Sequence, residues 1–152
     1  MEQTKQLQIR PYARLLTMLG EQLIKNERIA LVELIKNSYD ADADWVKVTF
    51  QGFGDNYKID ADSKIIIEDN GHGMNQDLIE NHWLNPATPE KIRRKKKKDT
   101  TSKGRIIQGE KGIGRFAILK LGRRIDIITK TKEDIQEHHI TYDFSKYDNE
   151  FL

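Results

Sequence analysis

Residues 64–74 read KIIIEDNGHGM, an apolar run followed by a polar turn with two glycines. The stretch opens with a short apolar run, residues 64–68, of the kind found in a central strand. An aspartate and two glycines spaced by one position follow the run (Asp69, Gly71 and Gly73). Such glycines let the backbone bend sharply and leave room for a flat ligand, and Asp69 can accept a hydrogen bond from an exocyclic amine such as that of adenine. Turns after strands use the same residue types, and His72 is interpreted as a spacer between the glycines.

A helix is predicted upstream, over residues 27–41. At about 100° per residue, Glu33, Asn37 and Asp40 lie within roughly 60° of one another. Four residues project from the opposite side of this helix: Leu31, Leu34, Ile35 and Ser38. One side can therefore pack on a sheet while the other presents two carboxylates and an amide in line. An ordinary amphipathic helix with a polar outer face gives the same pattern.

A glycine-rich motif, residues 109–115 (GEKGIGR), precedes a helix predicted from Ile113 to Gly122. Turns of this kind expose backbone N–H groups beside the positive end of a helix dipole, which favours phosphate. The motif is not a Walker A loop, because the Gly-Lys-Ser/Thr ending is absent. It also does not follow a first strand, as a dinucleotide-binding fingerprint should.

The remaining pattern predicts an α/β two-layer sandwich. A first helix is expected from Pro11 to about Lys25, and three further strands over residues 45–50, 124–130 and 138–144. Residues 75–108 are weakly patterned apart from a short helical stretch at 78–83. So long a segment inside a small domain indicates either a functional lid or disorder.

Composition excludes several classes of protein. The 152 residues, 37% of them hydrophobic, fit one domain, and the lack of cysteine excludes disulfides and thiolate chemistry. The longest apolar run has four residues, so no membrane span is predicted, and the N-terminus has no secretory pattern. A cytoplasmic protein is expected.

The basic side chains are concentrated in one segment. Residues 91–98 hold seven of the 26 basic side chains, which leaves 19 basic against 24 acidic side chains in the rest of the chain. This run is either a solvated loop or a site for an anionic partner such as nucleic acid.

The three motifs together resemble the GHKL superfamily, which includes the DNA gyrase B subunit, large heat-shock chaperones, histidine kinases and MutL mismatch-repair ATPases. The resemblance rests on Glu33-x-x-x-Asn37-x-x-Asp40-Ala41, Asp69-x-Gly71-x-Gly73 and Gly109-x-Lys111-Gly112-x-Gly114, in this order. It extends from about residue 23 to residue 129. Residues 31–41, LVELIKNSYDA, look closest to the chaperone, MutL and MORC-like branches.

The resemblance implies the Bergerat fold, a layer of helices over a mixed sheet with a mobile lid at about residues 75–108. It implies that Glu33 is the general base of ATP hydrolysis, that Asn37 coordinates Mg²⁺, and that Asp69 accepts the adenine amino group. The other implied nucleotide-binding residues are Asp40, Gly71, Gly73, Met74, Gly109, Lys111, Gly112, Ile113, Gly114 and Thr129. For Thr129, the alternative is a plain β-branched strand residue.

The implied function is a Mg-dependent, chaperone-like or MutL-like ATPase whose hydrolysis drives lid closure and a conformational or dimerisation cycle. One alternative is histidine-kinase-like phosphotransfer, which the presence of Glu33 opposes. Another is a non-catalytic nucleotide sensor or nucleic-acid-binding module. The chain ends at Leu152, before the second domain whose lysine reaches the γ-phosphate in several relatives. We therefore expect either the N-terminal part of a longer protein or a slow enzyme.

Overall fold

The computed structural model describes residues 24–83, 100–109 and 114–146, together with the helical residues Leu15, Met18 and Gln22. Of the first predicted helix, from Pro11 to about Lys25, Ile24 and Lys25 are described and are not helical. Apart from Leu15, Met18 and Gln22, the other residues of that helix and the basic run 91–98 lie outside the described residues. Within the described ranges, the predicted order of helices and strands is confirmed. The part of the chain that the structure describes contains no helix long and apolar enough to cross a bilayer.

Helix α2 spans Glu27–Asp40, as predicted. The Asn26 side chain caps it by accepting a hydrogen bond from the Ile29 N–H at 3.0 Å, and Glu27 complements the dipole in the first turn. The helix ends where Asp42 takes a left-handed backbone conformation, with φ at 59°. Asp42, and not a glycine, therefore takes the left-handed conformation at the end of α2. This conformation strains the backbone of Asp42, and the contacts around Asp42 must offset the strain.

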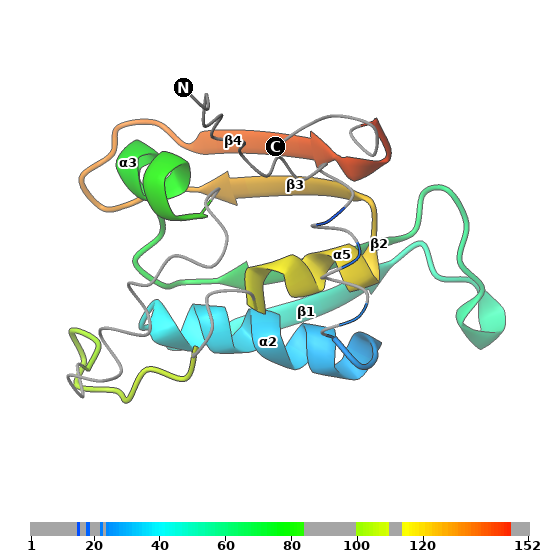
Figure 1. Cartoon of the computed structure of the whole chain (residues 1–152), viewed down its shortest axis with the longest axis horizontal. Helices are drawn as coiled ribbons and strands as arrows, with labels where there is room; N and C mark the ends of the chain where they lie inside the picture. The colour runs from blue at the N-terminus through cyan, green and yellow to red at the C-terminus, as the bar shows by residue number, and fades with distance from the viewer. Residues whose placement is uncertain are drawn as a thin grey trace, which may run out of the picture.

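The four strands form two antiparallel pairs. Strand β1 (Val46–Gln51) pairs with β2 (Lys64–Asp69), and β3 (Arg124–Thr129) pairs with β4 (His138–Asp143). Strands β2 and β3 run in the same direction, the sense expected in a mixed sheet (Figure 1). Between these two strands, however, the described residues form no ladder.

Short helical segments complete the fold. Helix α3 (Gln76–Leu78) continues as a π-helical stretch, Ile79–Trp83, in the region predicted to be helical. A 3₁₀ turn, Gly114–Ala117, leads into α5 (Ile118–Leu121), which ends at Gly122 as predicted. Further 3₁₀ turns cover Asp55–Tyr57, in the loop between β1 and β2, and Phe144–Lys146, after β4.

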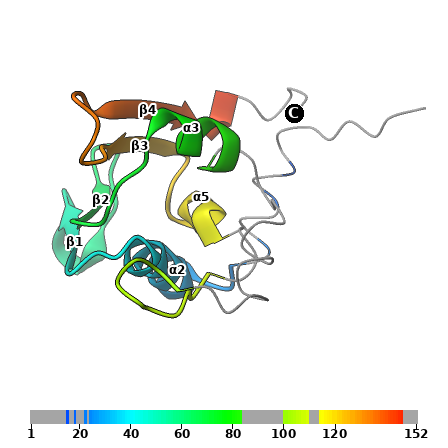
Figure 2. The same cartoon turned by 90° about the vertical axis from the view of Figure 1, so that its left-hand side faces the viewer.

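The elements form two layers, with the strands on one side and α2 and α5 on the other (Figure 2). Between the two helices lies a small core in which Ala30 and Ala117 are fully buried, with Ile24 and Leu121 beside them. Because Ala30 neighbours Glu33 and Asn37 around the helix, their side of α2 turns toward the other helix. The alternative of a polar outer face, which the sequence pattern left open, is therefore wrong.

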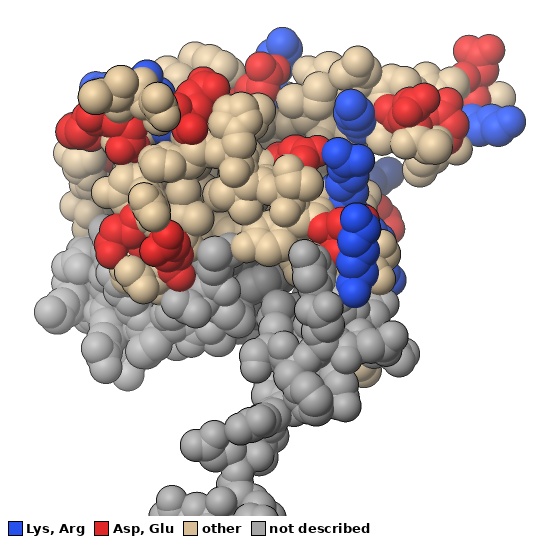
Figure 3. All heavy atoms as spheres, turned by 90° about the horizontal axis from the view of Figure 1, so that it is seen from above, with Lys and Arg blue, Asp and Glu red and all other residues tan. Residues whose placement is uncertain are grey.

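Charge is distributed in small groups over the face that contains β4. Seen from above β4, several clusters of acidic side chains and one line of basic side chains are exposed (Figure 3). This face therefore carries both signs of charge. The expectation of an anionic partner concerned residues 91–98 and stays a prediction.

Candidate functional site

Asp69 lies at the end of β2 and is held by two hydrogen bonds. The buried Ser38 hydroxyl of α2 donates to Oδ2 at 2.7 Å, and the Gly71 N–H donates to Oδ1 at 2.9 Å. A carboxylate has about four lone-pair sites, so Asp69 can still accept a hydrogen bond from a ligand. The sequence pattern places Ser38 on the side of the helix that packs on the sheet, but it does not predict this contact with Asp69. A hydroxyl among the apolar residues of that side was the signal that sequence reasoning missed.

The glycines of the loop after β2 are required by close contacts within the protein. A Cβ atom at Gly71 would lie 2.7 Å from the Ala41 carbonyl oxygen. At Gly73, where φ is +69°, a Cβ atom would lie 2.0 Å from the carbonyl oxygen of Lys130. The loop thus passes between the end of α2 and the end of β3 where no side chain fits. These contacts are a structural reason for glycine at both positions. That the two glycines admit a flat ligand stays a prediction.

Met74 and Thr129 connect this loop to β3. The Met74 N–H donates a hydrogen bond to the Thr129 Oγ1 atom at 2.9 Å. The Thr129 hydroxyl therefore does more than a plain strand residue would, and it lies next to the aspartate–glycine motif as the resemblance implies. Its predicted contact with the nucleotide stays a prediction.

Two further residues tie the loop to the end of α2. The Asn70 Oδ1 atom accepts hydrogen bonds from the backbone N–H groups of Asp44 and Trp45, at 2.8 and 3.1 Å. His72 donates to the Ala41 carbonyl oxygen from its backbone N–H at 2.9 Å and from Nδ1 at 2.7 Å. Because a carbonyl oxygen only accepts, this contact places the ring proton on Nδ1. His72 is thus more than a spacer.

Glu33 brings the first and third motifs together. Its Oε1 atom lies 2.7 Å from the Lys36 Nζ atom, and a Cβ atom at Gly114 would lie 2.8 Å from its Oε2 atom. The carboxylate is therefore packed against the main chain of the glycine motif. Asn37 lies one turn further along α2, and no hydrogen bond joins its side chain to another described residue.

The Asp40 side chain contacts the main chain at the start of the glycine motif. Its Oδ1 atom accepts from the Gln108 N–H at 2.7 Å and its Oδ2 atom from the Gly109 N–H at 2.9 Å. The next three predicted phosphate-binding residues, Lys111, Gly112 and Ile113, lie outside the described residues. The structure therefore brings Glu33 to one end of the motif, at Gly114, and Asp40 to the other, at Gly109, with Asn37 between them on α2.

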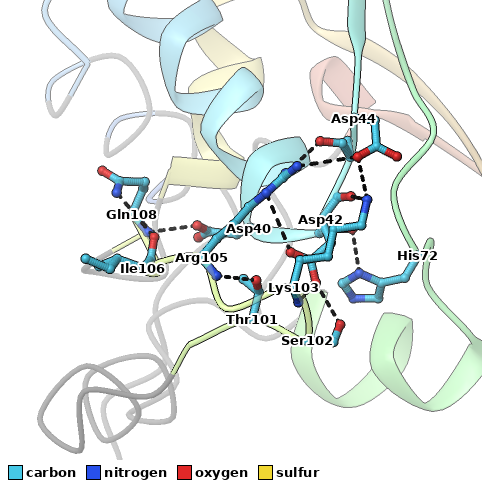
Figure 4. Close-up of polar contacts among 12 residues, drawn as sticks. Asp40, Asp42, Asp44, His72, Thr101, Ser102, Lys103, Arg105, Ile106 and Gln108 are labelled. Atoms are coloured by element: carbon cyan, nitrogen blue, oxygen red, sulfur yellow. Dashed lines mark hydrogen bonds and ion pairs between the residues drawn. The ribbon is translucent and has the colours of Figure 1, made fainter.

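Residues 100–109, here called the strap, lie across the C-terminal end of α2 (Figure 4). Thr100 and Ile106 form an isolated antiparallel β-bridge. Between them the chain turns at Gly104, where φ is +76°. The Ser102 hydroxyl donates to the Asp42 Oδ2 atom at 2.7 Å, and the Lys103 N–H donates to the same oxygen at 3.1 Å. The strap occupies part of the segment predicted to be a lid.

Asp42 is the buried anchor of the strap, with 6% of its surface exposed. Burial opposes its ionisation. Hydrogen bonds from Thr101, Ser102 and the Lys103 backbone, with the charge of Arg105, outweigh burial and lower the pKa of Asp42 to about 2. Asp42 is therefore ionised at neutral pH.

Two basic side chains of the strap also bind the end of α2. The Lys103 Nζ atom lies 2.5 Å from the Asp44 carboxylate. Arg105 donates a hydrogen bond to the Ala43 carbonyl oxygen at 2.6 Å. The Arg105 guanidinium also lies 5.0 Å from the centre of the Tyr39 ring. Sequence reasoning missed these contacts. The only signal was a pair of aspartates directly after the helix and a basic, glycine-containing turn about 60 residues later.

The donor set suits a magnesium ion with few protein ligands. No group of three or more histidine or acidic side chains in the described ranges could hold a metal ion. Mg²⁺ bound to a nucleotide, however, needs only one or two protein oxygens, because phosphates and water complete its octahedron. The Asn37 side-chain oxygen is a donor of the right chemistry, between two carboxylates of the same helix.

Comparison with known families gives one match. A family model described as histidine kinase-, DNA gyrase B- and HSP90-like ATPase matches residues 25–152. The matched range contains all three motifs and all four strands. It confirms the resemblance stated above and the α/β fold that the resemblance implies. No curated protein matches the chain.

Proposed function

Because the chain belongs to the family of histidine kinase-, DNA gyrase B- and HSP90-like ATPases, we propose that its ATP-binding domain hydrolyses ATP with Glu33 as the general base. The observation that supports this most is the position of the Glu33 carboxylate, with Oε2 packed against the glycine motif at Gly114. In this family, such motifs bind phosphates. A carboxylate at that place can take a proton from water that attacks the terminal phosphate.

The other motif residues have separate tasks in this proposal. Asp69, oriented by Ser38 and Gly71, accepts the amino group of adenine and so selects it over guanine. Backbone N–H groups of the glycine motif bind phosphate oxygens. Mg²⁺, held through Asn37, supplies charge neutralisation at the phosphates when it is bound. Lid closure and a dimerisation cycle of the chaperone or MutL type complete the proposed function.

Phosphotransfer to a partner histidine is the competing proposal. Histidine kinases usually lack a glutamate at the Glu33 position, and their glycine motif continues as Gly-x-Gly-Leu-Gly-Leu, where this chain reads Gly-Ile-Gly-Arg-Phe-Ala at residues 112–117. Free phosphate released from ATP by the purified chain supports hydrolysis. Phosphate transferred to a partner protein, with none released, supports the kinase alternative.

The proposed adenine site is tested by calorimetric titration with Mg-ATP and Mg-GTP. Asp69 is exposed in the structure, so the cost arises when a bound base covers it. An acceptor that is covered without a donor costs about 1–3 kcal/mol, so ATP is expected to bind roughly ten- to a hundredfold more tightly than GTP. Asp69→Asn should remove this preference. The control Asp55→Asn changes an exposed aspartate in the loop between β1 and β2, which projects away from the helices, and should leave both affinities unchanged (Figure 1). Equal affinities in the unmodified protein would refute the site.

A further inference from the structure

The structure assigns Asp40 to positioning: we infer that its carboxylate fixes the start of the glycine-rich motif on α2 rather than contacting the nucleotide. This inference rests on the proposed function, because the motif matters only if it binds phosphate. The sequence resemblance placed Asp40 among the nucleotide-binding residues. The contacts around it point to a different task.

Both oxygens of Asp40 are engaged by the main chain of the strap. Oδ1 accepts from Gln108 at 2.7 Å and Oδ2 from Gly109 at 2.9 Å. Two consecutive backbone N–H groups thus bind one carboxylate, an arrangement that fixes both the distance and the direction of the chain at Gly109. Hydrogen bonds to a charged acceptor are stronger than those between neutral groups.

The other end of the strap is fixed independently. Asp42 accepts hydrogen bonds from Ser102 and Lys103, and Arg105 donates to the Ala43 carbonyl oxygen at 2.6 Å. These contacts hold residues 102–105 against the turn after α2. Asp40 therefore adds something that they do not supply, which is the position of the strap's last two residues, where the glycine motif begins (Figure 4).

Helix α2 consequently contacts the glycine motif at two points. Glu33 lies against Gly114 and Asp40 binds Gly109, and the two acidic residues are two helical turns apart. One helix thus places the proposed base and the first residue of the phosphate-binding motif in a single rigid frame. A displacement of about 1 Å within such a frame can cost about a hundredfold in rate.

The test compares Asp40→Asn with the unmodified protein by amide hydrogen exchange without nucleotide. An asparagine can accept only through one atom, and its NH₂ group would face the second N–H. We expect exchange at Gln108 and Gly109 to rise about tenfold or more. Mg-ATP affinity should fall in the same variant, while the affinity for adenosine, which has no phosphate, should stay unchanged. The control Asp55→Asn, an exposed aspartate in the loop between β1 and β2, should leave exchange at Gly109 unchanged.

Two results would overturn the inference. One is unchanged exchange at both amides together with weakened ATP binding, which would show that Asp40 contacts the nucleotide directly. The other needs no variant: if the amides of Gln108 and Gly109 exchange in the unmodified protein as fast as exposed ones, the contact does not fix the motif. Failure of the unmodified protein to bind ATP would refute the proposed function alone, because the exchange measurements use no nucleotide.

Discussion

The Glu33 carboxylate lies between a lysine of its own helix and the main chain at Gly114. Because a general base acts in the reaction and not in adenine recognition, Glu33→Ala should lower phosphate release about 10²–10⁴-fold while Mg-ATP binding persists. Asn37→Ala should instead weaken Mg-ATP binding itself. Affinity by calorimetry and phosphate release are measured on the same samples, in the longest available chain.

Glu133→Ala serves as the control for Glu33→Ala, because Glu133 is an exposed residue of the turn between β3 and β4. It should change neither quantity. Hydrolysis by Glu33→Ala at the unmodified rate would end the case for a glutamate base and favour the phosphotransfer or sensor alternatives.

Gly73 and Gly104 share a left-handed backbone but differ in surroundings, so they form a matched pair. In the left-handed conformation of Gly73, an alanine costs about 1–2 kcal/mol, and its Cβ atom would also overlap the Lys130 main chain. At Gly104, nothing lies within 4 Å of a Cβ atom. Adding about 1–3 kcal/mol for overpacking, Gly73→Ala should cost about 2–5 kcal/mol of unfolding free energy. Gly104→Ala should cost about 1–2 kcal/mol. Urea unfolding measures both, and equal losses would contradict the close approach at Gly73.

At the scale of elements, the strap should respond to acid through Asp42. Its pKa in the folded protein, about 2, lies below the ordinary value of 3.8. The stability that ionised Asp42 contributes is therefore complete above about pH 4 and is lost as the pH falls toward 2. Asp44, Asp134 and Asp143 also have lowered pKa values, so only the difference between proteins isolates Asp42.

The measurement is urea unfolding of the unmodified protein and of Asp42→Asn between pH 5 and 2. We expect the stability difference between them to shrink across this window. A difference that stays constant down to pH 2 would mean that the charge of Asp42 does not hold the strap.

The elements were predictable because each is encoded by neighbouring residues. Alternation and apolar runs gave all four strands to within about a residue, and the sequence pattern gave α2 to within one residue. The cap at Asn26 was not predicted. The pairing of strands depends on contacts between distant residues, and period alone does not specify it.

The site was predictable only where a family motif names the residues. The motifs predicted that Glu33, Asp69 and the glycines gather around α2, but not what each contacts. The Asp40 contact with Gly109 spans 69 positions and has no pattern of its own. The side of α2 that faces the interior was left ambiguous, because a polar stripe is compatible with solvent as well as with a site.

For the molecule as a whole, nucleotide binding should appear as added stability. A ligand at a hundred times its dissociation constant adds about 2.7 kcal/mol to the unfolding free energy, which corresponds to a rise in Tm of about 5–10 °C for a domain of this size. Mg-ATP should give this rise in thermal unfolding, and ATP with a chelator a smaller one. At the same ATP concentration, Asp69→Asn should reduce the rise to about half or less, and an equal rise in that variant would place the nucleotide elsewhere.

The strap also bears on the order in which the chain folds. Along the sequence, the paired residues of β3 and β4 are near each other, as Thr129 and His138 show. Asp40 and Gln108, in contrast, are 68 positions apart. Closing a long loop costs more chain entropy than closing a hairpin, so we expect the strap to dock after the hairpins have formed. Arg105→Ala should then accelerate unfolding and leave the refolding rate nearly unchanged, whereas Ile127→Ala in β3 should slow refolding. Stopped-flow kinetics in urea would show both effects, and slower refolding of Arg105→Ala would mean that the strap is already docked in the folding transition state.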